Sequence, residues 1–159
     1  PLTNPAGAKR QILGVSDKSM AGKMAEVLSR LGSIKALVLR GDDGLDEITL
    51  SAKTQVWESE GGAVRQYTMS PGDFGFDQKS IDHIRVNTVN ESVNKLQKVL
   101  SGKAGPEREI VLLNSAAALM VSGVTDSFRD GIERAAESID SGQAKSKLDA
   151  LINLSNKLT

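Results

Sequence analysis

The first 40 residues alternate between two short apolar runs and one stretch with helical spacing. Gln11–Val15 and Lys35–Leu39 are apolar enough to be buried strands. Between them, apolar residues recur every three or four positions until Gly32 ends the pattern: Met20, Met24, Val27, Leu28 and Leu31. Ser16-Asp17 supplies a cap at the start of this helix. Strand, helix and strand within about 30 residues form a βαβ unit, so we expect the two strands to be parallel.

Two further strand-like runs flank a pair of glycines. Thr54–Glu60 and Ala63–Met69 place apolar residues among polar neighbours, and Gly61-Gly62 between them is typical of a two-residue hairpin turn. We therefore expect an antiparallel hairpin that lies at the edge of the sheet or outside it.

From Ser70 onward the spacing of apolar residues is helical. Helices are expected from Asn90 to Gly102, from Pro106 to Gly123, from Thr125 or Asp126 through Ile139, and from about Ala144. The predicted fold class is α/β, with a mostly parallel sheet that carries an antiparallel hairpin and is surrounded by helices. The length of 159 residues suggests about one domain.

Composition narrows the possible partners. No apolar run approaches the roughly 18 residues that span a bilayer, so no membrane partner is expected. Twenty basic and twenty acidic residues give a net charge of zero, which provides no general attraction to nucleic acid. The absence of cysteine excludes disulfides and thiolate zinc sites, and it is compatible with a cytoplasmic protein.

An acidic loop follows the second predicted strand. Gly41–Glu47 (Gly-Asp-Asp-Gly-Leu-Asp-Glu) holds four carboxylates in seven residues. Ligand sites in open α/β sheets lie beyond the carboxyl ends of the strands. Carboxylates on a loop suit Mg²⁺, which takes one or two of them together with phosphate oxygens and water. From spacing alone, the alternative is a polar surface loop whose aspartates hydrogen-bond to their own backbone.

Two motifs of the chain resemble those of the anthranilate phosphoribosyltransferase family. They are Pro1–Ala6 (Pro-Leu-Thr-Asn-Pro-Ala) and the acidic loop Gly41–Glu47. Pro71–Gly75 and Leu113–Leu119 are weaker matches in the family's order, so the resemblance covers essentially the whole chain. It implies that residues 1–159 are the carboxy-terminal α/β part of a nucleoside phosphorylase/phosphoribosyltransferase-type domain.

The resemblance implies an activity and a metal site. The family transfers the phosphoribosyl group of 5-phosphoribosyl diphosphate to anthranilate and releases pyrophosphate, a step of tryptophan biosynthesis. The matching motif would make Asp46 a ligand of one Mg²⁺ and Glu47 a contributor to both ions of a pair. Pro1, Thr3 and Asn4 would lie near the aromatic acceptor, although a proline-bounded turn explains them equally well. No catalytic nucleophile is expected.

The resemblance also implies parts that precede Pro1. The family's glycine-rich phosphate loop, its Lys-His-Gly-Asn segment and its anthranilate-binding arginine all come before the Pro-Leu-Thr-Asn-Pro motif. We therefore expect an amino-terminal half of the same protein as a partner, a homodimer when complete, and no turnover by the 159-residue chain alone.

Two other functions stay open from the sequence. One is a non-catalytic, nucleic-acid-binding relative of the same fold, for which a neutral chain with an intact acidic pair is poorly suited. The other is a pyrimidine nucleoside phosphorylase of related architecture.

Three single residues carry separate expectations. Arg40 is expected to pair with the acidic loop, since one arginine stands beside four carboxylates. His83, the single histidine, is expected at the surface without a metal role. Asn114 lies within an apolar helix and is expected to be a satisfied amide that caps or braces a loop.

Overall fold

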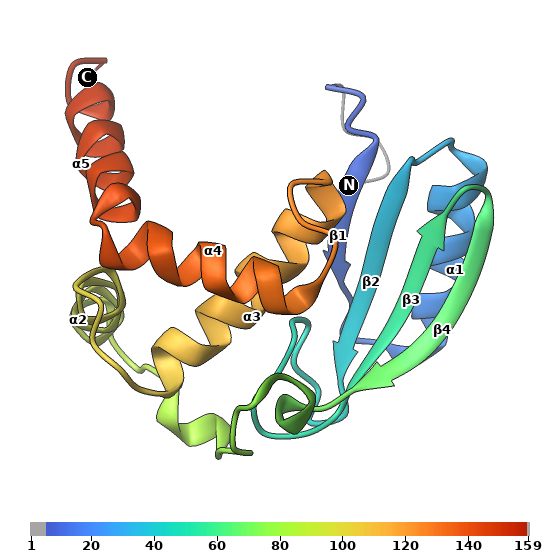
Figure 1. The fold of residues 1–159 in the computed structure, drawn as a ribbon, viewed down its shortest axis with the longest axis horizontal. Helices are drawn as coiled ribbons and strands as arrows, with labels where there is room; N and C mark the ends of the chain where they lie inside the picture. The colour runs from blue at the N-terminus through green and yellow to red at the C-terminus, as the bar shows by residue number, and fades with distance from the viewer. Residues whose placement is uncertain (1–5, 159) are drawn as a thin grey trace.

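A computed structural model describes residues 6–158 and contains a four-stranded sheet with helices on both faces (Figure 1). The strands stand in the order β1-β2-β3-β4, which is also their order along the chain. Their bounds are β1 Arg10–Gly14, β2 Lys35–Gly41, β3 Thr54–Glu60 and β4 Ala63–Met69. β1 and β2 are parallel, as the βαβ pattern predicts, and β3 and β4 form the predicted hairpin around Gly61-Gly62. The α/β class is confirmed.

The direction of the strands differs from the expectation of a mostly parallel sheet. β3 pairs with β2 in antiparallel register along its whole length, from Lys35 opposite Glu60 to Gly41 opposite Thr54. Among the described strands, one neighbouring pair is therefore parallel and two are antiparallel. The chain returns from β2 to β3 through a loop without a crossover helix, and such a link joins antiparallel strands. Of the two hairpin strands, β3 lies inside the described sheet and β4 lies at its edge.

The two faces of the sheet bury different helices. Helix α1 (Lys18–Arg30) packs on one face, where Ala21, Ala25 and Leu28 meet alternate strand residues such as Val38 and Trp57. Its N-cap is Asp17, whose carboxylate accepts a hydrogen bond from the Ser19 amide at 2.8 Å, as the Ser16-Asp17 pattern predicts. Val38 of β2 and Trp57 of β3 therefore lie on the face of the sheet that α1 covers.

The opposite face carries the larger core. Leu37, Leu39 and Val56 of the sheet pack there against Leu113 and Ala117. Both core helix residues belong to α3 (Pro106–Ser122). Figure 1 shows α1 and α3 on opposite sides of the sheet, which is the layering expected when strand side chains alternate between faces.

The remaining helices extend from this core. They are α2 Val89–Leu100, α4 Phe128–Asp140 and α5 Gln143–Ser155, with short 3₁₀ turns at Pro71–Phe74 and Ile81–His83. α3 begins at Pro106 and is closed by Gly123 as its C-cap, as predicted. α2 and α4 are capped by Thr88 and Ser127, whose hydroxyls accept amides three residues on, rather than by Asn90 and Asp126. Across the described residues, no helix combines the length and the hydropathy needed to cross a membrane.

A buried carboxylate lies within the sheet. Glu58 of β3 has no exposed side-chain surface, and it pairs with Lys35 at 3.3 Å and with Arg65 at 2.9 Å. The Tyr67 hydroxyl donates a third interaction at 2.9 Å. Burial raises the pKa of Glu58, but the bonds from Tyr67 and Arg65 and the charges of Arg65 and Lys35 outweigh it and hold that pKa below its ordinary value. Burial of the Tyr67 side chain, together with the adjacent Glu58 carboxylate, raises the pKa of Tyr67.

Candidate metal centre

The acidic loop lies at the carboxyl ends of β1 and β2. Gly41 ends β2, and its amide donates to the Leu45 carbonyl at 2.7 Å while its carbonyl accepts from the Gly44 amide at 3.0 Å. The Asp42 amide donates to the Lys53 carbonyl at 2.8 Å and so ties the loop to the start of β3. The loop is therefore a closed turn at the edge of the sheet where α/β proteins bind ligands.

Two of the four carboxylates are occupied by the protein itself. Asp43 accepts hydrogen bonds from the Leu45 amide at 3.1 Å, from the Thr49 hydroxyl at 2.6 Å and from the Ser51 hydroxyl. Burial raises the pKa of Asp43, but these hydrogen bonds outweigh it and lower the pKa below its ordinary value. Asp42 accepts from the Gln55 side-chain amide at 3.2 Å. The backbone-bonding alternative for this loop therefore accounts for Asp43, and a side-chain bond accounts for Asp42.

The other two carboxylates are available. Asp46 and Glu47 are exposed, and neither side chain has a hydrogen bond or ion pair within residues 6–158. They follow one another directly, and since no bond within residues 6–158 holds either side chain, their main chain is the part of the pair that the fold positions. A pair of free, adjacent carboxylates at a ligand-binding edge is the arrangement expected of a cation site that a substrate completes.

Two distant residues hold the main chain at this pair. The Asn114 side chain accepts a hydrogen bond from the Ile48 amide at 3.0 Å and donates to the Ile48 carbonyl at 2.9 Å. This confirms that Asn114 braces a loop. Gly14, the last residue of β1, packs directly against the backbone of Asp46. Sequence reasoning missed Gly14, although a glycine within a strand signals close approach of another backbone.

Arg40 does not pair with a carboxylate of the acidic loop, contrary to the expectation. Its guanidinium donates to the Ser16 carbonyl and to the Gly41 carbonyl, each at 3.0 Å. Of the ion pairs within the described chain, none involves Arg40. The main-chain carbonyls of Ser16 and Gly41 occupy two of its donors, and Asp46 and Glu47 have no cationic partner among residues 6–158.

The donor set fits Mg²⁺ better than a metal that needs a full protein cage. No group of three or more histidine, cysteine, aspartate or glutamate residues that could hold a metal occurs between residues 6 and 158. Mg²⁺ commonly uses one or two carboxylates and keeps water or substrate phosphate in its other positions.

His83 is exposed on a 3₁₀ turn, which confirms its surface position. Pro1, Thr3 and Asn4 lie outside the described residues.

Comparison with known proteins gives one consistent result. Residues 1–145 match the model of the glycosyl transferase family, a/b domain. An anthranilate phosphoribosyltransferase of Nitrosomonas eutropha is 47% identical over 159 residues, which are 100% of this chain and 47% of that protein. The chain thus spans about half the length of this relative.

Solved structures agree with the sequence match. The anthranilate phosphoribosyltransferase of Thermus thermophilus superposes with a TM-score of 0.84 at 32% identity, covering 94% of this chain and 44% of the other. The Saccharomyces cerevisiae anthranilate phosphoribosyltransferase in complex with PRPP and Mg superposes with a TM-score of 0.81 at 29% identity, covering 91% and 42%. The resemblance read from Pro1–Ala6 and Gly41–Glu47 is confirmed.

Proposed function

The chain belongs to the glycosyl transferase family with this α/β domain, and from that premise we propose that it is the metal-binding part of an anthranilate phosphoribosyltransferase. The enzyme would transfer the phosphoribosyl group of 5-phosphoribosyl diphosphate to the amine of anthranilate and release pyrophosphate. The observation that carries the proposal is the free pair Asp46 and Glu47 beside two carboxylates that the protein has already occupied. The matched relatives are phosphoribosyltransferases, which does not favour a nucleic-acid-binding protein or a nucleoside phosphorylase.

The chemistry explains why a carboxylate pair is useful here. When the diphosphate leaves the sugar carbon, negative charge grows on its oxygens, and bound Mg²⁺ stabilises that charge. Asp46 and Glu47 would orient the metal and its diphosphate at the carboxyl ends of β1 and β2. In the finer form of the proposal, Asp46 binds one Mg²⁺ and Glu47 contributes to both ions of a pair. No residue of the chain is required as a nucleophile.

The activity assay that tests this proposal uses the complete enzyme, meaning this chain joined to its proposed amino-terminal half. With 5-phosphoribosyl diphosphate and Mg²⁺, we expect anthranilate to be consumed and one pyrophosphate to be released per product. Removing Mg²⁺ with EDTA should stop the reaction, and adding Mg²⁺ back should restore it. Turnover that continues in EDTA would contradict the proposal, as would an enzyme that instead cleaves pyrimidine nucleosides with phosphate.

Two surfaces of the described chain are available for contact with the proposed amino-terminal half. The first is the open edge of the sheet at β1. β1 has a neighbour on one side only within the described residues, and its Ile12 is 36% exposed. Parallel strands are ordinarily covered on both faces and continued by further strands. Exposed apolar residues on α1 and at its C-cap lie in the same βαβ unit: Met20, Val27 and the cap residue Leu31. These features suit additional strands and helices from the same protein.

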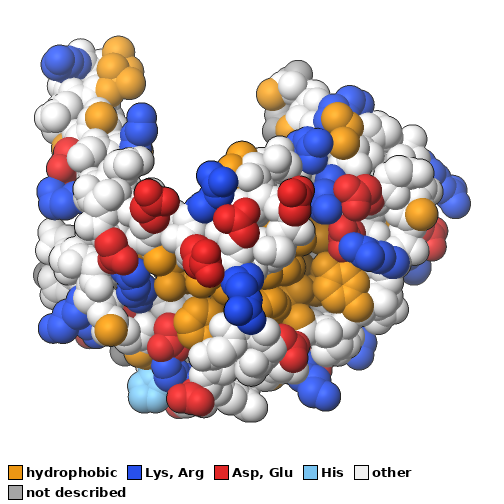
Figure 2. All heavy atoms as spheres, in the orientation of Figure 1, with side chains coloured by type: hydrophobic (Ala, Val, Ile, Leu, Met, Phe, Trp, Pro, Cys, Tyr) orange, Lys and Arg blue, Asp and Glu red, His pale blue; other side chains and the backbone are white. Residues whose placement is uncertain are grey.

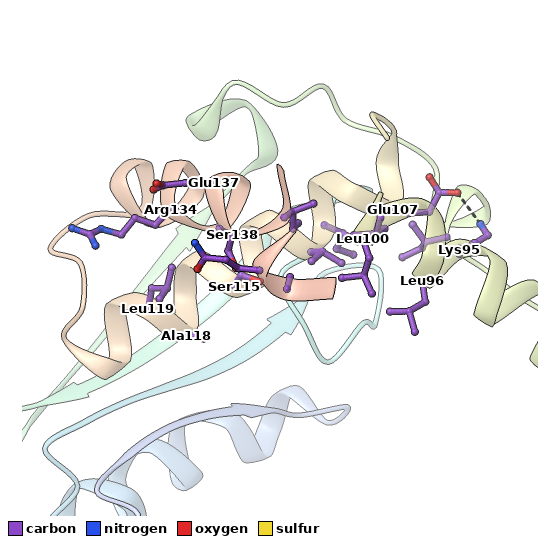
Figure 3. Close-up of a pocket in the computed structure, with 18 of the residues that line it drawn as sticks. Lys95, Leu96, Leu100, Glu107, Ser115, Ala118, Leu119, Arg134, Glu137 and Ser138 are labelled. Carbon is purple, nitrogen blue, oxygen red and sulfur yellow. Dashed lines mark ion pairs between the residues drawn. The ribbon is translucent and has the colours of Figure 1, made fainter. Parts of the chain in front are cut away.

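The second surface is a groove among the helices. It has a volume of about 960 Å³ and is lined by α2, α3, α4 and the start of α5. Figure 3 shows Leu96, Leu100 and Leu119 along it, with the ion pair of Lys95 and Glu107 at one end. On the face drawn in Figure 2, hydrophobic side chains also reach the surface between the helices and the sheet, whereas no strand residue lines the groove itself. No residue of the acidic loop lines the groove, so we assign it to the amino-terminal half rather than to substrate.

Replacing one groove leucine should weaken this association. Leu96→Asp puts a charge into the apolar groove, and we expect the affinity between separately produced halves to fall about tenfold or more. Val89→Asp is the matched control, because Val89 lies on the same helix, is 79% exposed and does not line the groove. Analytical ultracentrifugation of the two halves measures both affinities. Equal weakening by the two variants would place the partner elsewhere.

Other features of the proposal follow the family. Pro1, Thr3 and Asn4 would lie near the aromatic acceptor. The complete enzyme would be a cytoplasmic homodimer whose contacts lie largely in the amino-terminal half.

A further inference from the structure

The short segment that carries Asp46 and Glu47 is held from two sides by residues far away in the sequence. We propose that Asn114 and Gly14 are positioning residues of the metal site, Asn114 by fixing the peptide groups after Glu47 and Gly14 by fixing the backbone of Asp46. The inference rests on the proposed function, because it assumes that this pair binds Mg²⁺.

Asn114 makes contacts that only an amide side chain can make. Its oxygen accepts from the Ile48 amide, and its nitrogen donates to the carbonyls of Ile48 at 2.9 Å and Ile110 at 3.0 Å. A carboxylate of the same size could accept the first bond but could donate neither of the others. Ile48 is 1% exposed, so its amide and carbonyl depend on protein partners rather than on solvent while Asn114 is in place. Asn114 therefore holds both polar groups of the residue that directly follows Glu47.

Gly14 acts through its lack of a side chain. A Cβ atom at this position would lie 1.7 Å from the carbonyl oxygen of Asp46 and 2.7 Å from its carbonyl carbon. Both neighbours are backbone atoms, so the contact cannot be relieved by turning a side chain. The backbone of Gly14 does not adopt a positive φ, which means that space rather than conformation requires glycine here.

The two contacts matter because the carboxylates have no support of their own. Neither the Asp46 nor the Glu47 side chain is bonded within the described residues, whereas Asp43 anchors the preceding turn through Thr49 and Ser51. Asp43 anchors the main chain before the pair, Gly14 packs against it at Asp46, and Asn114 holds it just after Glu47. A site whose ligands are oriented in advance binds metal more tightly, and loss of such support typically costs about 10–100-fold in affinity or activity.

The test measures how turnover of the complete enzyme depends on Mg²⁺ concentration. Gly14→Ala, Asn114→Ala and Asn114→Asp should each raise the half-saturating Mg²⁺ concentration about 10–100-fold, with part of the lost turnover recovered at high Mg²⁺. Asn114→Asp keeps the side-chain size, so it reports on the bonds if the alanine variant does not fold. Gly72→Ala is the matched control for Gly14→Ala, because a Cβ there meets nothing within 4 Å and its φ is not positive. Asn94→Ala, at an exposed position of α2, is the control for Asn114.

Thermal unfolding of the same variants separates positioning from ordinary stability. If the Gly14 and Asn114 variants melt at lower temperature but keep the half-saturating Mg²⁺ concentration within about twofold, these residues are merely structural and the inference is wrong. Asp46→Asn distinguishes this result from a failure of the proposed function. If Asp46→Asn changes the response to Mg²⁺ and the Gly14 and Asn114 variants do not, only the positioning role fails. If Asp46→Asn also leaves that response unchanged, the metal assignment itself is overturned.

Discussion

Replacing Asp46 by asparagine, or Glu47 by glutamine, should lower turnover of the complete enzyme by roughly 100-fold or more. These are the two loop carboxylates without a partner among the described residues, so each substitution removes negative charge without breaking a bond within the protein. Loss of an indirect support of a metal ligand already costs about 10–100-fold, and loss of a ligand should cost at least the upper end of that range. Because neither side chain is bonded to another group within residues 6–158, thermal stability should change little.

Asp42→Asn is the matched control for these two variants. It removes the same charge from the same loop, but Asp42 already accepts a hydrogen bond from Gln55. Steady-state rates at several Mg²⁺ concentrations should show near-normal turnover for Asp42→Asn and a severe loss for the other two. An equal loss of turnover in all three variants would mean that the loop contributes only a general negative potential. Normal turnover in Asp46→Asn would remove the metal site from this pair.

Glu58→Gln should lower the free energy of unfolding by about 3 kcal/mol at neutral pH, near the low end for breaking a buried ion pair. The substitution keeps the size of the side chain and removes the charge that Lys35 and Arg65 face. The low end of the range applies because the Arg65 side chain is 70% exposed and can return to water, whereas that of Lys35 is only 14% exposed. Urea unfolding of the two proteins measures the difference.

Glu60→Gln is the control for the buried position. Glu60 lies on the same strand and also pairs with Lys35 at 3.3 Å, but its side chain is 54% exposed. An exposed pair contributes less than about 1 kcal/mol, so this variant should unfold almost like the unaltered protein. Equal losses in the two variants would show that burial of Glu58 adds nothing to the ion pair.

The effect of Glu58 should also disappear in acid. Its pKa is lowered in the folded protein and returns to about 4.5 on unfolding, so the unfolded chain binds the proton first as the pH falls. The stabilisation is therefore fully present above pH 4.5 and is lost as the pH drops through the lower, folded-state pKa. Urea unfolding at several pH values between about 7 and 3 should show the gap between the unaltered protein and Glu58→Gln narrowing in acid. A gap that stays constant to the lowest pH would contradict this charge balance.

Local sequence patterns predicted the elements because their causes are local. The spacing of apolar residues around Met24 and Leu28 requires only that one helix face be buried, and Gly61-Gly62 requires only a tight turn. The caps of α2 and α4 were displaced by one or two residues from the expected positions, since several nearby polar residues can cap and their geometry selects between them. Whether β3 lay inside the sheet or outside it depended on pairing with β2, which no local pattern fixes.

The sequence by itself determined that an acidic loop follows the second strand, and the resemblance selected Asp46 and Glu47 within it. Only the tertiary structure decided which of the four carboxylates stay free, because Thr49, Ser51 and Gln55 occupy the other two after the chain has turned back. It also brought Asn114, 66 residues away, onto Ile48, and Gly14 onto the backbone of Asp46. A free carboxylate is defined by the partners it lacks, and those partners are known only when distant segments have been packed together.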